Sequence, residues 1–222
     1  MEPVPLLEMD DPSLGRLVVG AGETVVLLGP SGAGKTNLVR ALLGVGAAPV
    51  PARLRVKGAA VDPRRVAALA GWVPDGDGVF LDLSVWDNVA RPPHLPPVDA
   101  DHTRDALDLV GLAERVRQPV SGMSRHERRR VALARAFALR RPLVVVDGEL
   151  DPALWALFPG VLSQAPGVEA ALLATARVGE RAWLADSCAL VADGRVVAQA
   201  PLAELDASTD PDVRSVLAWV TA

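Results

Sequence analysis

The 222-residue sequence predicts an α/β protein built around a mostly parallel β-sheet. Two observations carry this prediction. Short apolar runs, several of them bounded by Gly, Pro or Asp, alternate along the chain with segments whose apolar residues recur at helical spacing. Strands that are separated by helices form parallel pairs, and helices then cover both faces of the sheet. Half of the residues are apolar, which suffices for one large core.

The individual elements follow from local patterns. Strands are expected at the apolar runs 16–19, 24–28, 54–56, 143–146, 170–174, 189–192 and 196–198. Helical periodicity predicts helices over residues 35–43, 101–110 and 127–139. The last two strands flank Ala192-Asp193-Gly194, a sequence typical of a hairpin turn, so some antiparallel pairing is expected near the C-terminus. Residues 91–101, with four prolines, are expected to form a stiff loop.

Charge and composition exclude several function classes. The net charge of −4 argues against a general nucleic-acid binder, because phosphate contacts need a basic face. The acidic start lacks the features of a signal peptide, and the longest membrane-like stretch, residues 41–52, is too short to insert into a bilayer. The single cysteine, Cys188, is expected as a buried thiol in a reducing compartment. The sequence therefore predicts a cytoplasmic protein that reaches a membrane only through a partner.

Residues 29–36 read GPSGAGKT, a full match to the pattern G-x-x-x-x-G-K-[ST] between a predicted strand and a predicted helix. Gly32 and Gly34 let the backbone curl so that N–H groups face phosphates, and the following helix adds the positive end of its dipole. Lys35 can reach the β- and γ-phosphates, and the Thr36 hydroxyl can ligate Mg²⁺. An ordinary glycine turn is the alternative, which the Lys-Thr pair argues against. The expected nucleotide-binding residues are Gly29, Pro30, Ser31, Gly32, Ala33, Gly34, Lys35, Thr36 and Asn37.

Asp147 ends the apolar run LVVV and is the expected second ligand of the metal. A strand that ends beside the phosphate site can present this carboxylate to Mg²⁺. The alternative is an aspartate that only caps a turn.

The order of these motifs resembles the nucleotide-binding subunit of an ABC transporter over nearly the whole chain. The most telling run is RRRVALARAFALRRPLVVVD, which leads from the signature helix to the Walker B strand; LDP at 150–152 resembles the D-loop, and LLATA at 171–175 resembles the strand before the switch histidine. The resemblance implies a P-loop NTPase fold with an antiparallel portion formed near the N- and C-termini. It also implies a core subdomain of residues 1–74 and 137–222 and a small helical subdomain of residues 75–136.

The same resemblance implies ATP and Mg²⁺ as ligands. Members of this family work as head-to-tail dimers, so a homodimer or a heterodimer with another ABC subunit is expected. A transmembrane permease is the expected partner, which would hold the chain at the inner face of the cell membrane.

The chain departs from the family in the residues that act on the γ-phosphate. Asp75 replaces the Q-loop glutamine, which shortens the side chain and adds charge beside the metal. The signature Leu-Ser-Gly-Gly-Gln aligns with residues 123–127, where only Ser124 is kept. Arg125 and His126 replace the glycines that allow close approach to phosphate. Arg125 either supplies charge to a phosphate or is a solvated arginine.

The groups that activate water are also replaced. Gly148 falls at the position of the catalytic glutamate and cannot polarise water, and Ala176 replaces the switch histidine. Glu149 lies one residue late; it either acts as a relocated base, if Gly148 turns the chain, or is a solvated loop acid. No aromatic residue precedes Trp72 to stack on adenine.

Because both the altered signature and the missing glutamate lie in one chain, pairing with an intact subunit would leave neither site of the dimer whole. Arg128, Arg129 and Arg130 are expected on a solvated or interface face of the signature helix. Three hypotheses result: an ATP-binding transporter subunit with weak or absent hydrolysis, a soluble nucleotide-gated scaffold without a permease, and an active ATPase that uses Glu149.

Overall fold

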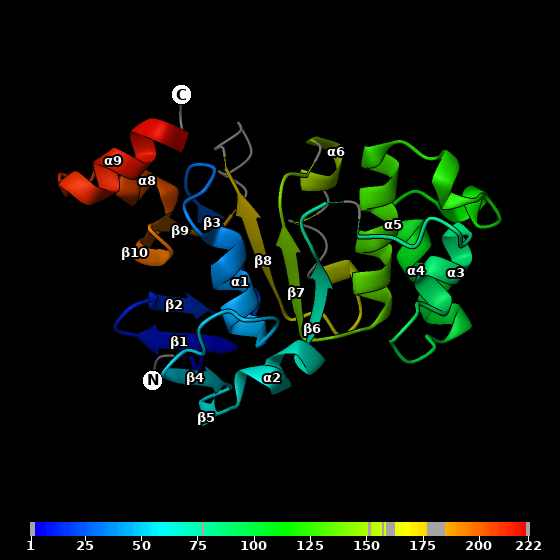
Figure 1. Cartoon of the computed structure of the whole chain (residues 1–222), viewed down its shortest axis with the longest axis horizontal. Coiled ribbons are helices and arrows are strands. Elements are labelled where there is room, and N and C mark those ends of the chain that lie inside the picture. Colours follow the sequence, from blue (N-terminus) through cyan, green and yellow to red (C-terminus); the bar gives the residue numbers. More distant parts are fainter. Residues whose placement is uncertain are drawn as a thin grey trace.

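The computed structural model describes residues 3–76, 78–150, 152–156, 158, 163–176 and 185–220, which form two β-sheets with helices packed around them (Figure 1). The larger sheet has the strand order β10-β9-β3-β8-β7-β6. Its strands are β3 (Thr24–Leu28), β6 (Ala70–Val73), β7 (Leu143–Asp147), β8 (Ala170–Thr175), β9 (Ser187–Ala192) and β10 (Arg195–Ala200). Neighbouring strands are parallel except for the β9–β10 hairpin. The predicted mostly parallel sheet is therefore confirmed.

The smaller sheet is antiparallel and has the order β2-β1-β4-β5. Its strands are β1 (Leu7–Asp11), β2 (Gly15–Val19), β4 (Arg53–Val56) and β5 (Ala59–Ala60). The Gln199 side chain on β10 joins the two sheets, because its amide accepts a hydrogen bond from Val18 N at 2.9 Å and donates one to Val18 O at 2.6 Å. The antiparallel portion expected near both ends of the chain is thus present as this sheet and the C-terminal hairpin.

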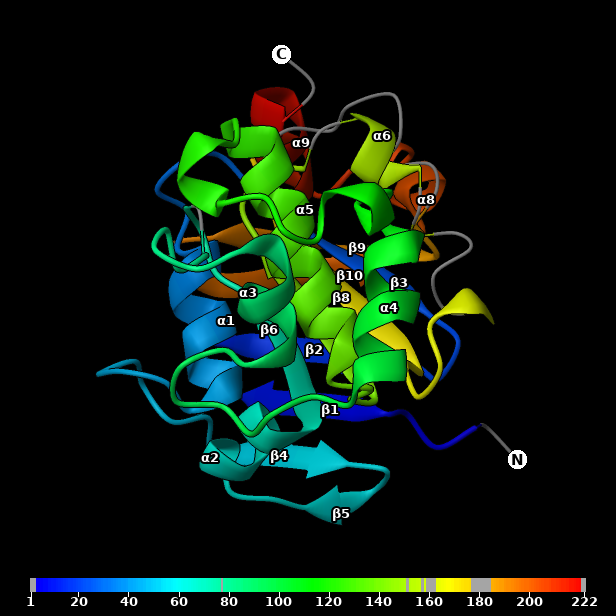
Figure 2. The same ribbon diagram turned by 90° about the vertical axis from the view of Figure 1, so that its right-hand side faces the viewer.

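The helices are α1 (Lys35–Leu43), α2 (Pro63–Val66), α3 (Val85–Ala90), α4 (Ala100–Leu109), α5 (Arg125–Ala138), α6 (Pro152–Trp155), α8 (Leu202–Asp206) and α9 (Pro211–Val220). Short 3₁₀ turns lie at Ala67–Leu69, Ala113–Arg115 and Val120–Gly122. Helices α3, α4 and α5 pack together beside β6, away from the small sheet (Figures 1 and 2). The boundaries of the helical subdomain at residues 75 and 136 stay a prediction.

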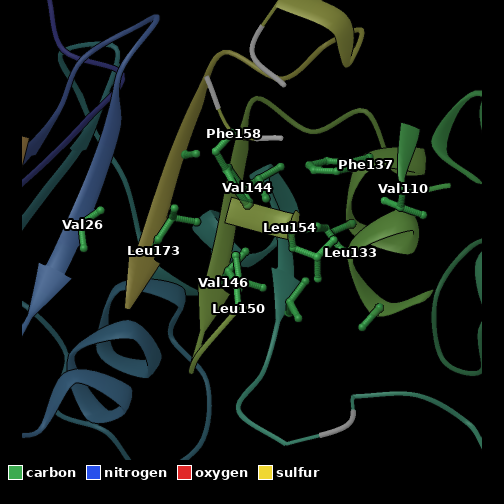
Figure 3. Packing of buried hydrophobic residues seen from close by; sticks show 14 of the residues in the cluster. Val26, Val110, Leu133, Phe137, Val144, Val146, Leu150, Leu154, Phe158 and Leu173 are labelled. Carbon is green, nitrogen blue, oxygen red and sulfur yellow. The ribbon is translucent and has the colours of Figure 1, made fainter. Parts of the chain in front are cut away.

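Side chains of the large sheet point alternately into two cores, as the period of a strand requires. Val144 and Val146 of β7 belong to the core that α5 covers with Leu133 and Phe137 (Figure 3). Val145, between them, belongs to the other core, which α1 and the small sheet cover. Helices and strands on both faces therefore fix β7, whose last residue is Asp147.

Cys188 on β9 is fully buried, and burial raises the pKa of its thiol to about 11. This confirms the expected buried strand thiol. Within the ranges that the structure describes, no helix combines the length and apolar character needed to cross a membrane.

Candidate nucleotide and metal site

The phosphate loop, residues 29–34, connects the end of β3 to the start of α1. Gly32 and Gly34 have φ values of +84° and +92°, a region that favours glycine. Gly34 is the N-cap of α1, and its carbonyl accepts a hydrogen bond from Leu38 N at 2.9 Å. Ser31, Gly32 and Asn37 are exposed, whereas Gly29 and Ala33 are buried. The loop and the positive end of α1 therefore face outward together, as anion binding requires.

The turn between β9 and β10 supports the phosphate loop from the side. Gly194 N donates a hydrogen bond to Ala33 O at 2.8 Å. A β-carbon built on Gly34 would lie 2.5 Å from Gly194 Cα, so the two glycines are in direct contact. Asp193 and Gly194 both have positive φ values, +48° and +78°, which fit a tight hairpin turn of the kind expected from the sequence.

The ammonium group of Lys35 lies against the loop that precedes it. Its Nζ donates hydrogen bonds to Gly29 O at 2.6 Å and Pro30 O at 2.9 Å. Partial burial lowers the pKa of Lys35, and the carboxylates of Asp147 and Glu149 oppose this shift. Lys35 is thus held at the phosphate loop with two carboxylates close enough to interact with its charge.

Thr36 and Asp147 meet across the gap between α1 and β7. Thr36 Oγ1 donates a hydrogen bond to Asp147 Oδ1 at 3.0 Å. Asp147 is only 2% exposed, and its second oxygen, Oδ2, is buried without a hydrogen-bond partner among the described residues. Burial raises the pKa of Asp147, with an opposing effect from Thr36. A buried carboxylate oxygen that lacks a donor is costly, and a hydroxyl beside a carboxylate is the kind of oxygen pair that binds Mg²⁺. The two residues therefore fit a magnesium ion.

Asp75 lies beside Gly148, the residue that follows Asp147 in the sequence. Gly148 has a φ of +87°, and a β-carbon built on it would lie 2.6 Å from Asp75 Oδ1. Gly148 N donates to Ala174 O at 3.0 Å, which continues the pairing of β7 with β8. The space in which a side chain at position 148 would start is therefore filled by the Asp75 carboxylate.

The predicted position of Arg129 was wrong. Arg129 was expected on a solvated or interface face, but it is only 4% exposed. Its Nη1 donates to Pro74 O and Gly76 O at 2.7 and 3.1 Å, and its Nη2 donates to Asp147 O and Gly148 O at 2.8 and 3.3 Å. Arg128 and Arg130, its neighbours, are half-buried rather than exposed.

The segment expected at the position of the family signature forms a helix cap. Ser124 is the N-cap of α5, and its hydroxyl and Glu127 exchange hydrogen bonds in a capping box. Arg115 forms an ion pair with Glu127, and this hydrogen bond is the main cause that lowers the pKa of Glu127 to about 2. Arg125 and His126 are exposed at the start of the helix.

The other predicted residues are placed as follows. Glu149 is exposed, and its charge acts on Lys35. Ala176 follows β8 and is half-buried. Asp151, in the segment expected as the D-loop, lies outside the described residues.

The fold and the loop geometry define a P-loop nucleotide-binding protein. The family model for ABC transporters matches residues 16–150. The chain is 32% identical over 211 residues to the thiamine import ATP-binding protein ThiQ of Cereibacter sphaeroides, covering 89% of each chain. It is 31% identical to the intermembrane phospholipid transport system ATP-binding protein MlaF of Escherichia coli K12, over 90% of this chain and 80% of that one. The chain belongs to the ABC transporter family, which confirms the resemblance seen in its motifs.

Solved structures agree on the fold. The structure of cbiO1 from Clostridium perfringens, part of the ABC transporter complex cbiONQ, has a TM-score of 0.78 at 19% identity, with 92% of this chain and 91% of that chain covered. An ATP-binding subunit of an ABC transporter has a TM-score of 0.71 at 22% identity, with 96% and 99% covered.

Proposed function

We propose that the chain is an ATP-binding subunit of an ABC-type transporter that binds Mg-ATP and hydrolyses it slowly or not at all. The observation that carries this proposal is the contrast between Asp147, the last residue of β7, and Gly148, which follows it. The Asp147 carboxylate accepts a hydrogen bond from Thr36, an arrangement that supports binding of Mg²⁺. Gly148, at the position where the family resemblance puts the catalytic glutamate, has no side chain, and the Asp75 carboxylate occupies the adjoining space.

The binding half of this proposal rests on the phosphate loop. Backbone N–H groups of Ser31, Gly32 and Gly34 and the N-terminus of α1 would hold the phosphates, with Lys35, Thr36 and Asn37 following at the start of the helix. Thr36 and Asp147 would hold Mg²⁺, which would neutralise phosphate charge. The unpartnered Oδ2 of Asp147 is the atom that such an ion would satisfy.

The loss of hydrolysis rests on what replaces the reactive groups. Ser124 and Glu127 are engaged with each other in the cap of α5, and Arg125 and His126 stand where glycines would allow close approach. Ala176 has no group that could donate a hydrogen bond from its side chain to a phosphate. Each of these changes lies where the family resemblance places a group that acts on the γ-phosphate, so stabilisation of the transition state would be weakened.

Partners are proposed from the relatives. ThiQ, MlaF and the molybdate/tungstate import protein WtpC of Archaeoglobus fulgidus, 31% identical over 86% of this chain and 83% of that one, are all ATP-binding proteins of transport systems. The chain would pair with a transmembrane permease at the cytoplasmic face of the membrane and act as a dimer. The cargoes of these relatives differ, so they favour none for this chain. Recovery of a soluble partner in place of a multi-span membrane protein would instead favour a scaffold without a permease.

The decisive experiment measures Mg-ATP binding and turnover on the same purified sample. Wild-type protein should bind Mg-ATP and release phosphate more slowly than about 1 s⁻¹, below the ordinary enzyme range. Lys35→Ala should weaken binding strongly, because it removes the ammonium group that lies against the phosphate loop. Turnover above about 1 s⁻¹ that disappears in Lys35→Ala would overturn the weak-hydrolysis part of the proposal.

Two observations favour a second candidate, an active ATPase that uses Glu149 as a base. The charge of Glu149 acts on Lys35, and the positive φ of Gly148 turns the chain so that the next residue does not continue the strand. If Glu149 takes a proton from water, Glu149→Gln should abolish whatever turnover exists, while exposed Glu204→Gln should not change it. Equal turnover in both variants would eliminate this candidate.

A further inference from the structure

Arg129 contacts two segments of the metal site through a single planar group. It lies on α5 five residues after Ser124, and its guanidinium is buried between the segment that follows β6 and the end of β7. Nη1 donates to Pro74 O and Gly76 O, and Nη2 donates to Asp147 O and Gly148 O, with distances between 2.7 and 3.3 Å. These carbonyls belong to the residues that flank Asp75 and to the pair Asp147 and Gly148.

The guanidinium of Arg129 links the segments that follow β6 and β7, beyond the point where the two strands stop pairing. The parallel register of β6 with β7 runs from Ala70 with Leu143 to Val73 with Val146. Directly beyond the last paired residues, Arg129 forms hydrogen bonds with both segments. The two segments therefore keep a fixed separation where Asp75 contacts Gly148. A fork of N–H groups can bind carbonyls on two sides, which a lysine ammonium on its flexible stem cannot reproduce.

The charge of Arg129 suits this place. A buried guanidinium needs hydrogen bonds and nearby negative charge to offset its desolvation. The four carbonyls supply the hydrogen bonds, and Asp147 interacts favourably with its charge. Removal of the guanidinium would leave the carbonyls of both segments without these donors, so the two segments would be free to shift relative to each other.

We propose that Arg129 is a positioning residue of the metal site: it holds the Asp147 carboxylate against Thr36 and keeps Asp75 beside Gly148. The proposal rests on the proposed binding of Mg-ATP. Arg129 would not contact the nucleotide itself, so the affinity for ATP without metal and the gain in affinity from Mg²⁺ should respond differently to its replacement. Affinity for metal-free ATP should depend on the phosphate loop alone, and the gain that Mg²⁺ adds should depend on Arg129.

The test compares ATP affinity in Mg²⁺ with ATP affinity in EDTA for wild type, Arg129→Met and Arg129→Lys. Residues that support a metal ligand contribute about 10–100-fold to metal affinity, so Arg129→Met should lose that much of the Mg²⁺-dependent gain, and Arg129→Lys should lose part of it. Affinity in EDTA should stay within about twofold of wild type, because the phosphate loop is unchanged. Arg130→Met, a half-buried neighbour on the same helix, is the matched control and should behave as wild type.

A second measurement follows the backbone directly. Gly148 N bonds to Ala174 O, so hydrogen exchange at this amide reports on the end of β7. Arg129→Lys should exchange faster at Gly148 than wild type, while amides in the β3–β8 ladder keep their protection. If Arg129→Met does not fold, the Mg²⁺-dependent gain and the exchange rate of Arg129→Lys alone test whether Arg129 positions the metal site.

Two results would overturn the inference. An unchanged Mg²⁺-dependent gain in Arg129→Lys or a folded Arg129→Met would show that Arg129 does not position the metal site. Equal losses in Mg²⁺ and in EDTA would show a general structural role instead. A wild-type protein that binds no ATP in either condition would overturn the proposed function itself, which is a different outcome.

Discussion

Oδ1 of Asp75 lies 2.6 Å from the point where a β-carbon of residue 148 would stand, so the exposed Asp75 carboxylate must move before residue 148 can be larger than glycine. The backbone of Gly148, with φ at +87°, adds a second barrier, since residues with a β-carbon rarely adopt this conformation. Positions 75 and 148, to which the family resemblance assigns the Q-loop glutamine and the catalytic glutamate, are therefore neighbours in space.

Gly148→Ala should destabilise the protein, and part of the loss should depend on Asp75. The left-handed backbone alone costs about 1–2 kcal/mol for a residue with a β-carbon. Gly22 has a similar φ of +81° with nothing within 4 Å of a built β-carbon, so Gly22→Ala measures that cost by itself. In denaturant unfolding, Gly148→Ala should cost more than Gly22→Ala in wild type and a similar amount in the Asp75→Ala background. Additive losses, with no coupling between positions 75 and 148, would contradict the contact.

Thr36→Val should separate metal binding from nucleotide binding. The substitution keeps the shape of the side chain but removes the hydroxyl that bonds to Asp147 Oδ1. ATP affinity in Mg²⁺ should fall by at least about tenfold, while affinity in EDTA should change little. Titration calorimetry under both conditions checks this, and an unchanged affinity in Mg²⁺ would place the metal elsewhere.

The charge of Glu127 should stabilise the fold only above acid pH. Its pKa is about 2 in the folded protein, against 4.5 as the ordinary value, chiefly because Arg115 bonds to it. A carboxyl with a lowered folded pKa contributes stability that is complete above its unfolded pKa and is lost as the pH falls through its folded pKa. Glu127→Gln can keep the capping hydrogen bonds but removes the charge.

The difference in melting temperature between wild type and Glu127→Gln should therefore be largest above about pH 4.5 and should shrink from there toward pH 2. Exposed Glu114→Gln, also near Arg115, is the control and should show no such dependence. A difference that stays constant from pH 7 to pH 2 would argue against the ion pair.

Gln199→Leu should loosen the junction of the two sheets. The amide of Gln199 bonds to both polar groups of Val18, and the variant leaves them without these partners. The unfolding free energy should drop by about 1–3 kcal/mol. Exposed Gln164→Leu should change it by no more than about 0.5 kcal/mol. Equal stabilities of the two variants would mean that solvent replaces the amide without cost.

The local patterns of the sequence predicted the elements that carry the phosphate site. The strand 24–28 and the helix 35–43 agree with β3 and α1, because an apolar run, a glycine turn and helical spacing are each decided within a few residues. The strands β1 and β6 were missed. β1 has the sequence LEMDD with alternating burial, and its acidic residues interrupt the apolar run by which a strand would be predicted. β6 is a four-residue AGWV whose glycine packs against α5, a contact that the local sequence does not show.

The interior of the site was less predictable, since it depends on neighbours distant in sequence. Arg129 stands in a run of three arginines, which is typical of a polar surface. A signal was present nonetheless: residue 129 lies three and four positions before Ala132 and Leu133, on the buried face of α5. The contact of Asp75 with Gly148 joins residues 73 positions apart, and the pairing of β6 with β7 and the hydrogen bonds of Arg129 to both segments bring them together.

The contact of Gly34 with Gly194 bears on when this protein can acquire its site during synthesis. The phosphate loop is complete in sequence by residue 34, yet the turn that bonds to Ala33 O lies 160 residues later, in the β9–β10 hairpin. A growing chain therefore exposes the loop long before its lateral support emerges from the ribosome. Full affinity for phosphate should appear late in translation, after the hairpin has paired with the rest of the sheet.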